Sequence, residues 1–167
     1  AGSGKSVLVK LLCNLYTPTT GNIDWICNDK NSPPLITYIP QKPTIIEGSV
    51  LDNIAFGSRS ISHKACVTAA RNAGLLSSYI TCTGFSLNTH LPFGGASISL
   101  STMQRIFLAR AFAARSSSIL ILDYFYSEIE TSEFVASLLN LRDLYKTVFV
   151  VTPSQEVVNI SEQLIEL

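Results

Sequence analysis

The first six residues, Ala-Gly-Ser-Gly-Lys-Ser, have the types and spacing of the second half of a phosphate-binding loop. Gly2, Ser3 and Gly4 can bring backbone N–H groups around phosphate oxygens, because glycine adds no side chain there. Lys5 places a positive charge on the β- and γ-phosphates, and Ser6 can ligate Mg²⁺. A helix that begins here adds the positive end of its dipole. The segment predicts a nucleotide site; a flexible turn with a solvated lysine is the alternative for the segment taken alone.

A carboxylate that could act on the same nucleotide is Asp123, which directly follows the apolar run 119–122. At the carboxyl end of a buried parallel strand, an Asp lies beside the phosphate loop and can hold Mg²⁺ through water. A helix cap or a turn is the alternative interpretation, and it would be the better one without Lys5 and Ser6. Together the three residues predict a Mg²⁺-nucleotide site.

The elements that must position these residues are helices alternating with short apolar strands. Apolar residues at helical spacing predict helices over 6–16, 58–80, 101–115 and 130–145. Short apolar runs predict strands at 23–27, 36–39, 119–122, 147–151 and 163–167. Four-residue apolar runs flanked by helices are typical of parallel strands buried on both faces. The predicted fold class is α/β, with a mainly parallel sheet flanked by helices and a helical section beside it.

Composition narrows the classes of protein that fit. A chain of 167 residues with 47% hydrophobic and 14% charged residues can bury a core and forms one domain or most of one. Twelve Lys and Arg balance twelve Asp and Glu, which argues against nucleic acid as a partner. No apolar stretch is long enough to span a bilayer. The four cysteines form no C-x-x-C pair and are expected to be reduced; zinc is not expected.

Three further segments carry a resemblance to a known family. Residues 38–43 are Tyr-Ile-Pro-Gln-Lys-Pro, residues 48–57 are Gly-Ser-Val-Leu-Asp-Asn-Ile-Ala-Phe-Gly, and residues 105–111 are Arg-Ile-Phe-Leu-Ala-Arg-Ala. With the phosphate loop and Asp123, they resemble the nucleotide-binding domain of ABC transporters, especially exporters, over essentially the whole chain. The resemblance implies a P-loop NTPase fold: one partial domain over 1–167, with an inserted helical subdomain at about 50–112. It also implies that the start of the domain lies before Ala1.

The resemblance also implies cofactors and partners. ATP and Mg²⁺ would be held by the phosphate loop and Asp123. Gln41 falls on the glutamine that in the family reaches Mg²⁺ and the attacking water. The implied partners are the transmembrane domain of a transporter and a second nucleotide-binding domain, identical or different. The implied location is the cytoplasmic face of a membrane.

The chain departs from the family at its signature motif. The positions that are L-S-G-G-Q in the family are Ile98, Ser99, Leu100, Ser101 and Thr102 here, so only Ser99 is identical. The family's glycines let backbone N–H groups approach the γ-phosphate bound by the opposite subunit. Leu100 and Ser101 add side chains where that approach requires none.

The groups that activate water are also replaced. Tyr124 stands where the family has its catalytic glutamate, and Pro153 stands where it has a histidine. Glu130 replaces the aspartate of the D-loop. A phenol with a pKa near 10 is a poor base at neutral pH, and proline cannot shuttle a proton. His63, at the start of the middle helix, and His90 do not substitute by position.

These observations support one leading hypothesis and two alternatives. The leading one is an ABC-type domain that binds Mg-ATP and dimerises to drive or regulate transport, with impaired hydrolysis. The first alternative is an active transport ATPase whose water is oriented by unusual groups. The second is a decayed, non-functional copy. Steady-state ATPase activity and nucleotide binding distinguish the three.

Overall fold

The computed structural model of the chain describes residues 4–25, 34–56, 58, 60–76, 84–114, 118–123 and 129–166. The chain divides into two units. The sheet unit comprises Ala1–Gln41, Ser116–Tyr126 and Tyr145–Leu167, and the helical unit comprises Lys42–Arg115 and Ser127–Leu144.

The sheet unit is built on three parallel strands, β1 (Ile36–Ile39), β4 (Ile119–Leu122) and β5 (Thr147–Val150), in the order β1-β4-β5. Ile36 pairs with Ile119, and Ile119 in turn pairs with Thr147. All four residues of the central strand β4 are buried, as the Ile-Leu-Ile-Leu run requires. The predicted α/β class with a parallel sheet and flanking helices is confirmed.

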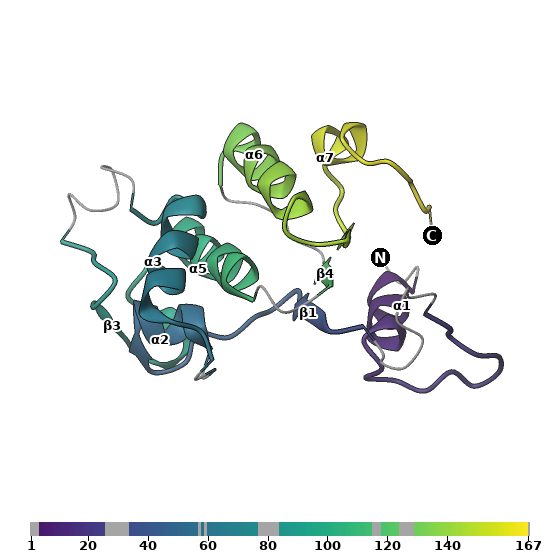
Figure 1. The fold of residues 1–167 in the computed structure, drawn as a ribbon, viewed down its shortest axis with the longest axis horizontal. Coiled ribbons are helices and arrows are strands. Elements are labelled where there is room, and N and C mark those ends of the chain that lie inside the picture. Colours follow the sequence, from purple (N-terminus) through teal and green to yellow (C-terminus); the bar gives the residue numbers. More distant parts are fainter. Residues whose placement is uncertain are drawn as a thin grey trace. The chain divides into compact units, whose positions relative to one another are not determined.

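Helix α1 (Lys5–Leu12) covers one face of this sheet, and Figure 1 shows it in purple near β1. Val9 of α1 forms a buried cluster with Ile119 and Ile121 of β4. Alternate strand residues point to the same face, so Asp123 continues the row of Ile119 and Ile121. The sheet therefore directs the Asp123 side chain to the same side as α1. A short helix, α7 (Gln155–Asn159), follows β5.

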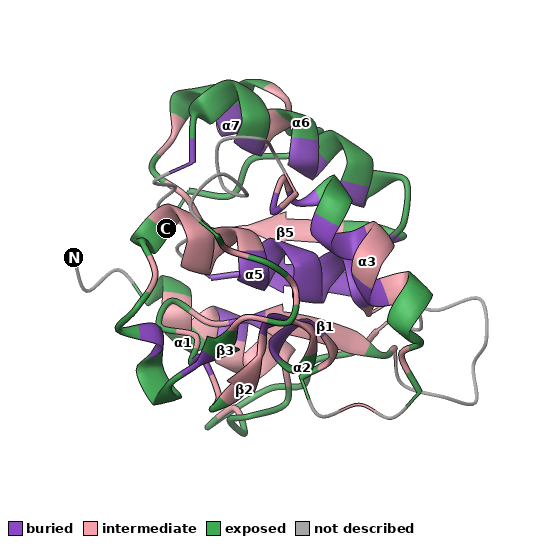
Figure 2. Cartoon of the chain, turned by 90° about the vertical axis from the view of Figure 1, so that its left-hand side faces the viewer, coloured by how far each residue is buried: buried purple, intermediate pink, exposed green. Residues whose placement is uncertain are grey.

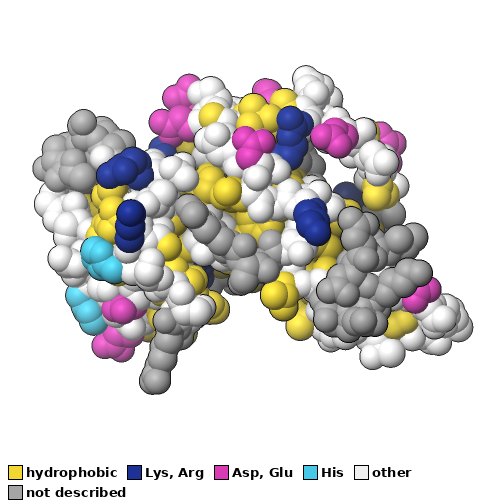
Figure 3. All heavy atoms as spheres, viewed as in Figure 1, with side chains coloured by type: hydrophobic (Ala, Val, Ile, Leu, Met, Phe, Trp, Pro, Cys, Tyr) yellow, Lys and Arg dark blue, Asp and Glu magenta, His cyan; other side chains and the backbone are white. Residues whose placement is uncertain are grey.

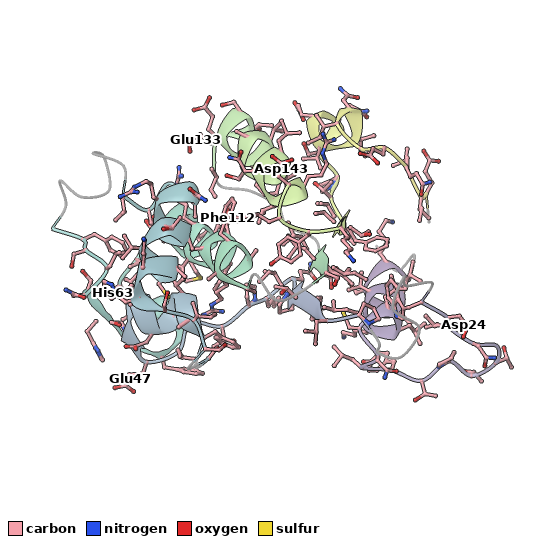
Figure 4. All side chains as sticks on the ribbon, in the orientation of Figure 1. Asp24, Glu47, His63, Phe112, Glu133 and Asp143 are labelled. Carbon is pink, nitrogen blue, oxygen red and sulfur yellow. The ribbon has the colours of Figure 1, made fainter. Side chains whose placement is uncertain are left out.

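The helical unit is centred on α5 (Leu100–Ala113), which α2 (Val50–Ala55), α3 (His63–Asn72) and α6 (Thr131–Arg142) contact. Residues 106–113 of α5 are all buried, and Figure 2 shows this helix mostly in purple. Phe112, labelled on α5 in Figure 4, is 2% exposed. Strand β2 (Gly48–Ser49) pairs antiparallel with β3 (His90–Leu91), and the 3₁₀ turn η1 (Phe93–Gly95) follows.

A buried arginine links α5 to the chain around α2. Arg110 is 8% exposed and donates to the carbonyl oxygens of Asn53 (2.7 Å) and Thr44 (2.9 Å) and to Asn53 Oδ1 (3.1 Å). Its guanidinium lies 4.3 Å from the ring centre of Phe56 and 5.0 Å from that of Phe107. Burial lowers the pKa of Arg110 to about 10, which still leaves it charged at neutral pH. Backbone and amide oxygens, together with two aromatic rings, thus stabilise the buried cation.

Replacing Arg110 with methionine is expected to lower the free energy of unfolding by about 2–4 kcal/mol. Methionine keeps an unbranched apolar stem but removes the donor that the backbone carbonyl oxygens of Asn53 and Thr44 share. Urea denaturation measures the change. Arg71→Met is the matched control, since Arg71 is exposed in the last turn of α3. An equal loss from both changes would contradict a special role for Arg110.

Several predicted elements differ from the structure. No strand forms at 23–25 or at 163–166, the described parts of the strands predicted at 23–27 and 163–167. Trp25 instead packs its side chain against the core of the sheet unit, and Leu164 and Ile165 are exposed. The helix predicted over 58–80 is shorter: α3 begins at His63, labelled in Figure 4, and ends at Asn72, while residues 59 and 77–80 lie outside the described residues.

Glycine ends this helix for a specific reason. Gly74 has φ +72, and a Cβ added there would lie 2.2 Å from Nη1 of Arg105. Arg105 approaches because it donates to the carbonyl of Ala73 and forms an ion pair with Glu133 of α6, labelled in Figure 4. A side chain at position 74 would therefore displace the link between α3, α5 and α6.

Candidate nucleotide-binding site

The three parallel strands bring their carboxyl ends to one edge of the sheet. The backbone N–H of Asp123 donates to the carbonyl of Ile39 (2.9 Å), and that of Val151 donates to the carbonyl of Leu122 (2.9 Å). Gln41, Asp123 and Pro153 follow β1, β4 and β5 in turn. The predicted positions after these strands thus share the edge at which ligands bind in open α/β sheets.

Asp123 is the buried acidic group at this edge. Asp123 is only 2% exposed to solvent. Ser6 Oγ donates to its Oδ1 at 3.4 Å, across 117 positions of sequence. The structure thus brings the side chains of Ser6 and Asp123, two of the residues singled out in the sequence, into contact.

Tyr38 makes the second contact with this carboxylate. Its hydroxyl group donates to Asp123 Oδ2 at 3.1 Å. Burial and the neighbouring Asp123 carboxylate raise the pKa of Tyr38 to about 12. In the sequence, Tyr38 stands out only as the first residue of the segment 38–43. The available signal was a hydroxyl-bearing side chain in the third position of a strand with isoleucine at both ends.

The phosphate loop is described from Gly4 onward. Gly4 has φ +84, the left-handed conformation that favours glycine, and immediately precedes α1. A Cβ added there would meet nothing within 4 Å, so the requirement for glycine is conformational. Lys5 and Ser6 form the first turn of α1, and Lys5 is exposed. Gly2 and Ser3 lie outside the described residues.

Comparison with known proteins decides the family. The sequence profile of the family described as ABC transporter matches residues 1–124. The chain belongs to the ABC transporter family.

The chain is similar in sequence to two named transport proteins. It is 34% identical over 171 residues to the lactococcin-A transport/processing ATP-binding protein of Lactococcus lactis subsp. lactis, covering 99% of this chain and 24% of that protein. It is 35% identical over 133 residues to antigen peptide transporter 2 of Rattus norvegicus, covering 73% of this chain and 18% of that protein. The chain thus spans about a quarter or less of the length of these relatives. It is an ATP-binding domain of the ABC transporter family, and the family resemblance seen in the sequence is confirmed.

A solved structure shows the same fold. A bacterial ABC exporter of the Atm1 family with ATP bound superposes with a TM-score of 0.75 at 18% identity, covering 97% of this chain and 29% of that chain. The predicted P-loop NTPase fold is therefore confirmed. Membership of the ABC transporter family implies ATP as the nucleotide. Within the described ranges, none of the helices combines the length and the apolar content needed to cross a membrane.

The ABC signature positions begin α5 in the helical unit. Ser99 is the N-cap of α5, and its Oγ accepts from the backbone N–H of Thr102 at 3.1 Å. The same Oγ lies 3.0 Å from Ser101 Oγ and 2.9 Å from Thr102 Oγ1. Leu100 is 63% exposed. The hydroxyls of Ser101 and Thr102 therefore gather around that of Ser99, beside the exposed Leu100.

The structure describes only some of the positions at which the family resemblance leads us to expect water-activating groups. Tyr124 lies outside the described residues. Pro153 is exposed and immediately precedes Ser154, the N-cap of α7. Glu130 is the N-cap residue of α6, and its carboxylate accepts from Ser132 Oγ at 2.8 Å. The Glu130 carboxylate is thus hydrogen-bonded to Ser132 in the first turn of α6.

Proposed function

We propose that this ABC domain binds Mg-ATP at the phosphate loop and Asp123 and hydrolyses it poorly. The observation that carries the proposal is the meeting of the Ser6 hydroxyl and the buried Asp123 carboxylate at the carboxyl edge of a parallel sheet. This arrangement suits Mg²⁺, which prefers oxygen ligands and binds through few protein groups.

Each residue of the proposed site has a distinct role. Backbone N–H groups of Gly2, Ser3 and Gly4 receive phosphate oxygens, and Lys5 supplies the positive charge. Ser6, Gln41 and Asp123 are proposed as the groups that hold Mg²⁺. When bound, the metal neutralises charge on the phosphates. The exposure of Lys5 and Gln41 supports access for a nucleotide.

Poor hydrolysis follows from the replaced residues. Without a general base, the rate falls by about 10²–10⁴-fold. Tyr124 and Pro153 cannot supply the base or the proton carrier that the family uses. At the signature, Leu100 and Ser101 add side chains where close backbone approach is needed, and the hydroxyls of Ser101 and Thr102 both lie within hydrogen-bond distance of Ser99 Oγ.

The proposed partners follow from the family. We propose pairing with a transmembrane domain and with a second nucleotide-binding domain, at the cytoplasmic face of a membrane, to drive or regulate transport. The helical subdomain is proposed at about 50–112, which includes α2, α3 and α5 of the helical unit. Nucleic acid is not proposed: on the face in Figure 3, the described Lys and Arg side chains lie interspersed with Asp and Glu.

Two measurements on the complete protein test the proposal: equilibrium binding of Mg-ATP and steady-state ATPase activity. Binding with turnover at least about a hundredfold below that of a relative with an intact glutamate is the expected result. Ordinary turnover would favour the active transport ATPase instead. Absence of binding would favour the decayed copy.

A further inference from the structure

We infer that Tyr38 is a positioning residue for the proposed metal site: its hydroxyl group holds Oδ2 of Asp123, and Oδ1, on the side of Ser6, is the oxygen that would serve the metal. The inference rests on the proposed function, since it concerns the same site. It assigns a role to a residue that belongs neither to the phosphate loop nor to the other proposed Mg²⁺ ligands, Gln41 and Asp123.

The strand register brings Tyr38 to Asp123. Tyr38 of β1 pairs with Ile121 of β4, and Asp123 lies two residues farther along the same row. A diagonal neighbour two positions away is within reach of a long aromatic side chain. The pairing of the two strands therefore brings together two residues that are 85 positions apart in sequence.

The body of Tyr38 is held by apolar packing. Its ring packs against the cluster of Val9, Ile119 and Ile121 on the α1 face of the sheet. The ring is thereby anchored while the hydroxyl group extends to the carboxylate. Phenylalanine would keep this packing and remove only the donor, which makes the position suitable for a clean test.

The two donors together fix the plane of the carboxylate. Tyr38 binds Oδ2 at 3.1 Å, while Ser6 is farther from Oδ1, at 3.4 Å. Asp123 is 2% exposed, so few water molecules can replace a lost donor. Mg²⁺ demands near-octahedral geometry and tolerates a rotated ligand poorly. Removing the closer of the two donors should therefore weaken the binding of Mg²⁺ more than the binding of the nucleotide itself.

The test is a Mg²⁺ titration of nucleotide binding by the full-length protein, followed with a fluorescent ATP analogue. Tyr38→Phe should raise the half-saturating Mg²⁺ concentration about tenfold, the size of one hydrogen bond to a charged group. Affinity for the analogue in EDTA should stay unchanged. Tyr145→Phe is the matched control, because it removes the hydroxyl of a buried tyrosine whose side-chain partner is Thr37 of β1. This change should alter neither the half-saturating Mg²⁺ concentration nor the affinity in EDTA.

A second background separates positioning from general structure. In a protein that already carries Asp123→Asn, adding Tyr38→Phe should not change the half-saturating Mg²⁺ concentration any further. The reason is that the two residues act through one contact. An unchanged Mg²⁺ requirement in Tyr38→Phe overturns the inference while the proposed function stands. Loss of the EDTA affinity in Tyr38→Phe also overturns it, since the residue then supports the fold. A wild-type protein that binds no nucleotide overturns both.

Discussion

Replacing Lys5 with alanine is expected to weaken Mg-ATP binding by about 10- to 100-fold. Among the proposed phosphate ligands, Lys5 alone brings a full positive charge, and hydrogen bonds to charged groups are stronger than neutral ones. Equilibrium binding of ATP by the complete protein, at one fixed Mg²⁺ concentration, measures the loss.

The same helix offers a matched control. Lys10 lies in the last turn of α1, with its Nζ 5.2 Å from the ring centre of Tyr16. Lys10→Ala removes the same side chain and the same charge, but away from the start of the helix. It should leave ATP affinity unchanged, and so should Tyr124→Phe. Equal losses from Lys5→Ala and Lys10→Ala would mean that the nucleotide lies elsewhere.

The sequence predicted the centre of the sheet and Asp123 because these depend on local pattern alone. An apolar run buried on both faces specifies β4, and the residue that follows it must emerge at the carboxyl edge. The end of α1 is less visible, because helical spacing continues to Tyr16 while the helix ends at Leu12. The left-handed backbone of Asn14, with φ +57, accompanies that early end.

Short and long-range features escaped prediction for different reasons. Helix α2 has too few residues for periodicity, although Ser49 and Asp52 form a capping box that would have marked its start. The Tyr38 contact with Asp123 needs the register of β1 on β4, which no local pattern contains. The hydroxyl cluster at Ser99 likewise depends on rotamers at the start of α5.

Restoring catalysis is expected to need both sets of family residues. In the family, each ATP lies between the phosphate loop and water-activating residues of one subunit and the signature of the other. In a homodimer, both sites would combine Tyr124 and Pro153 with Leu100 and Ser101. Tyr124→Glu with Pro153→His should therefore recover little ATPase activity alone, and so should the signature set Leu100→Gly, Ser101→Gly and Thr102→Gln.

The structure indicates that the signature set leaves α5 in place. Leu100 is exposed, so its removal opens no core cavity. Ser99 still caps the helix because it accepts from a backbone N–H that Gln at position 102 retains. Two glycines in the first turn cost about 1 kcal/mol each, while the buried residues 106–113 anchor the rest of the helix.

With both sets together, the ATPase rate should rise by about 10²–10⁴-fold over the unmodified protein. The gain should exceed the sum of the separate effects, because the restored groups act on one transition state. Adding Lys5→Ala to the combined variant should abolish the gain, which assigns the activity to this site rather than to a contaminant. If the unmodified protein already hydrolyses ATP at ordinary transporter rates, the replaced residues do not limit the reaction. The water must then be oriented by other groups at the carboxyl edge of the sheet. Gln41 would be the first of these residues to test by substitution.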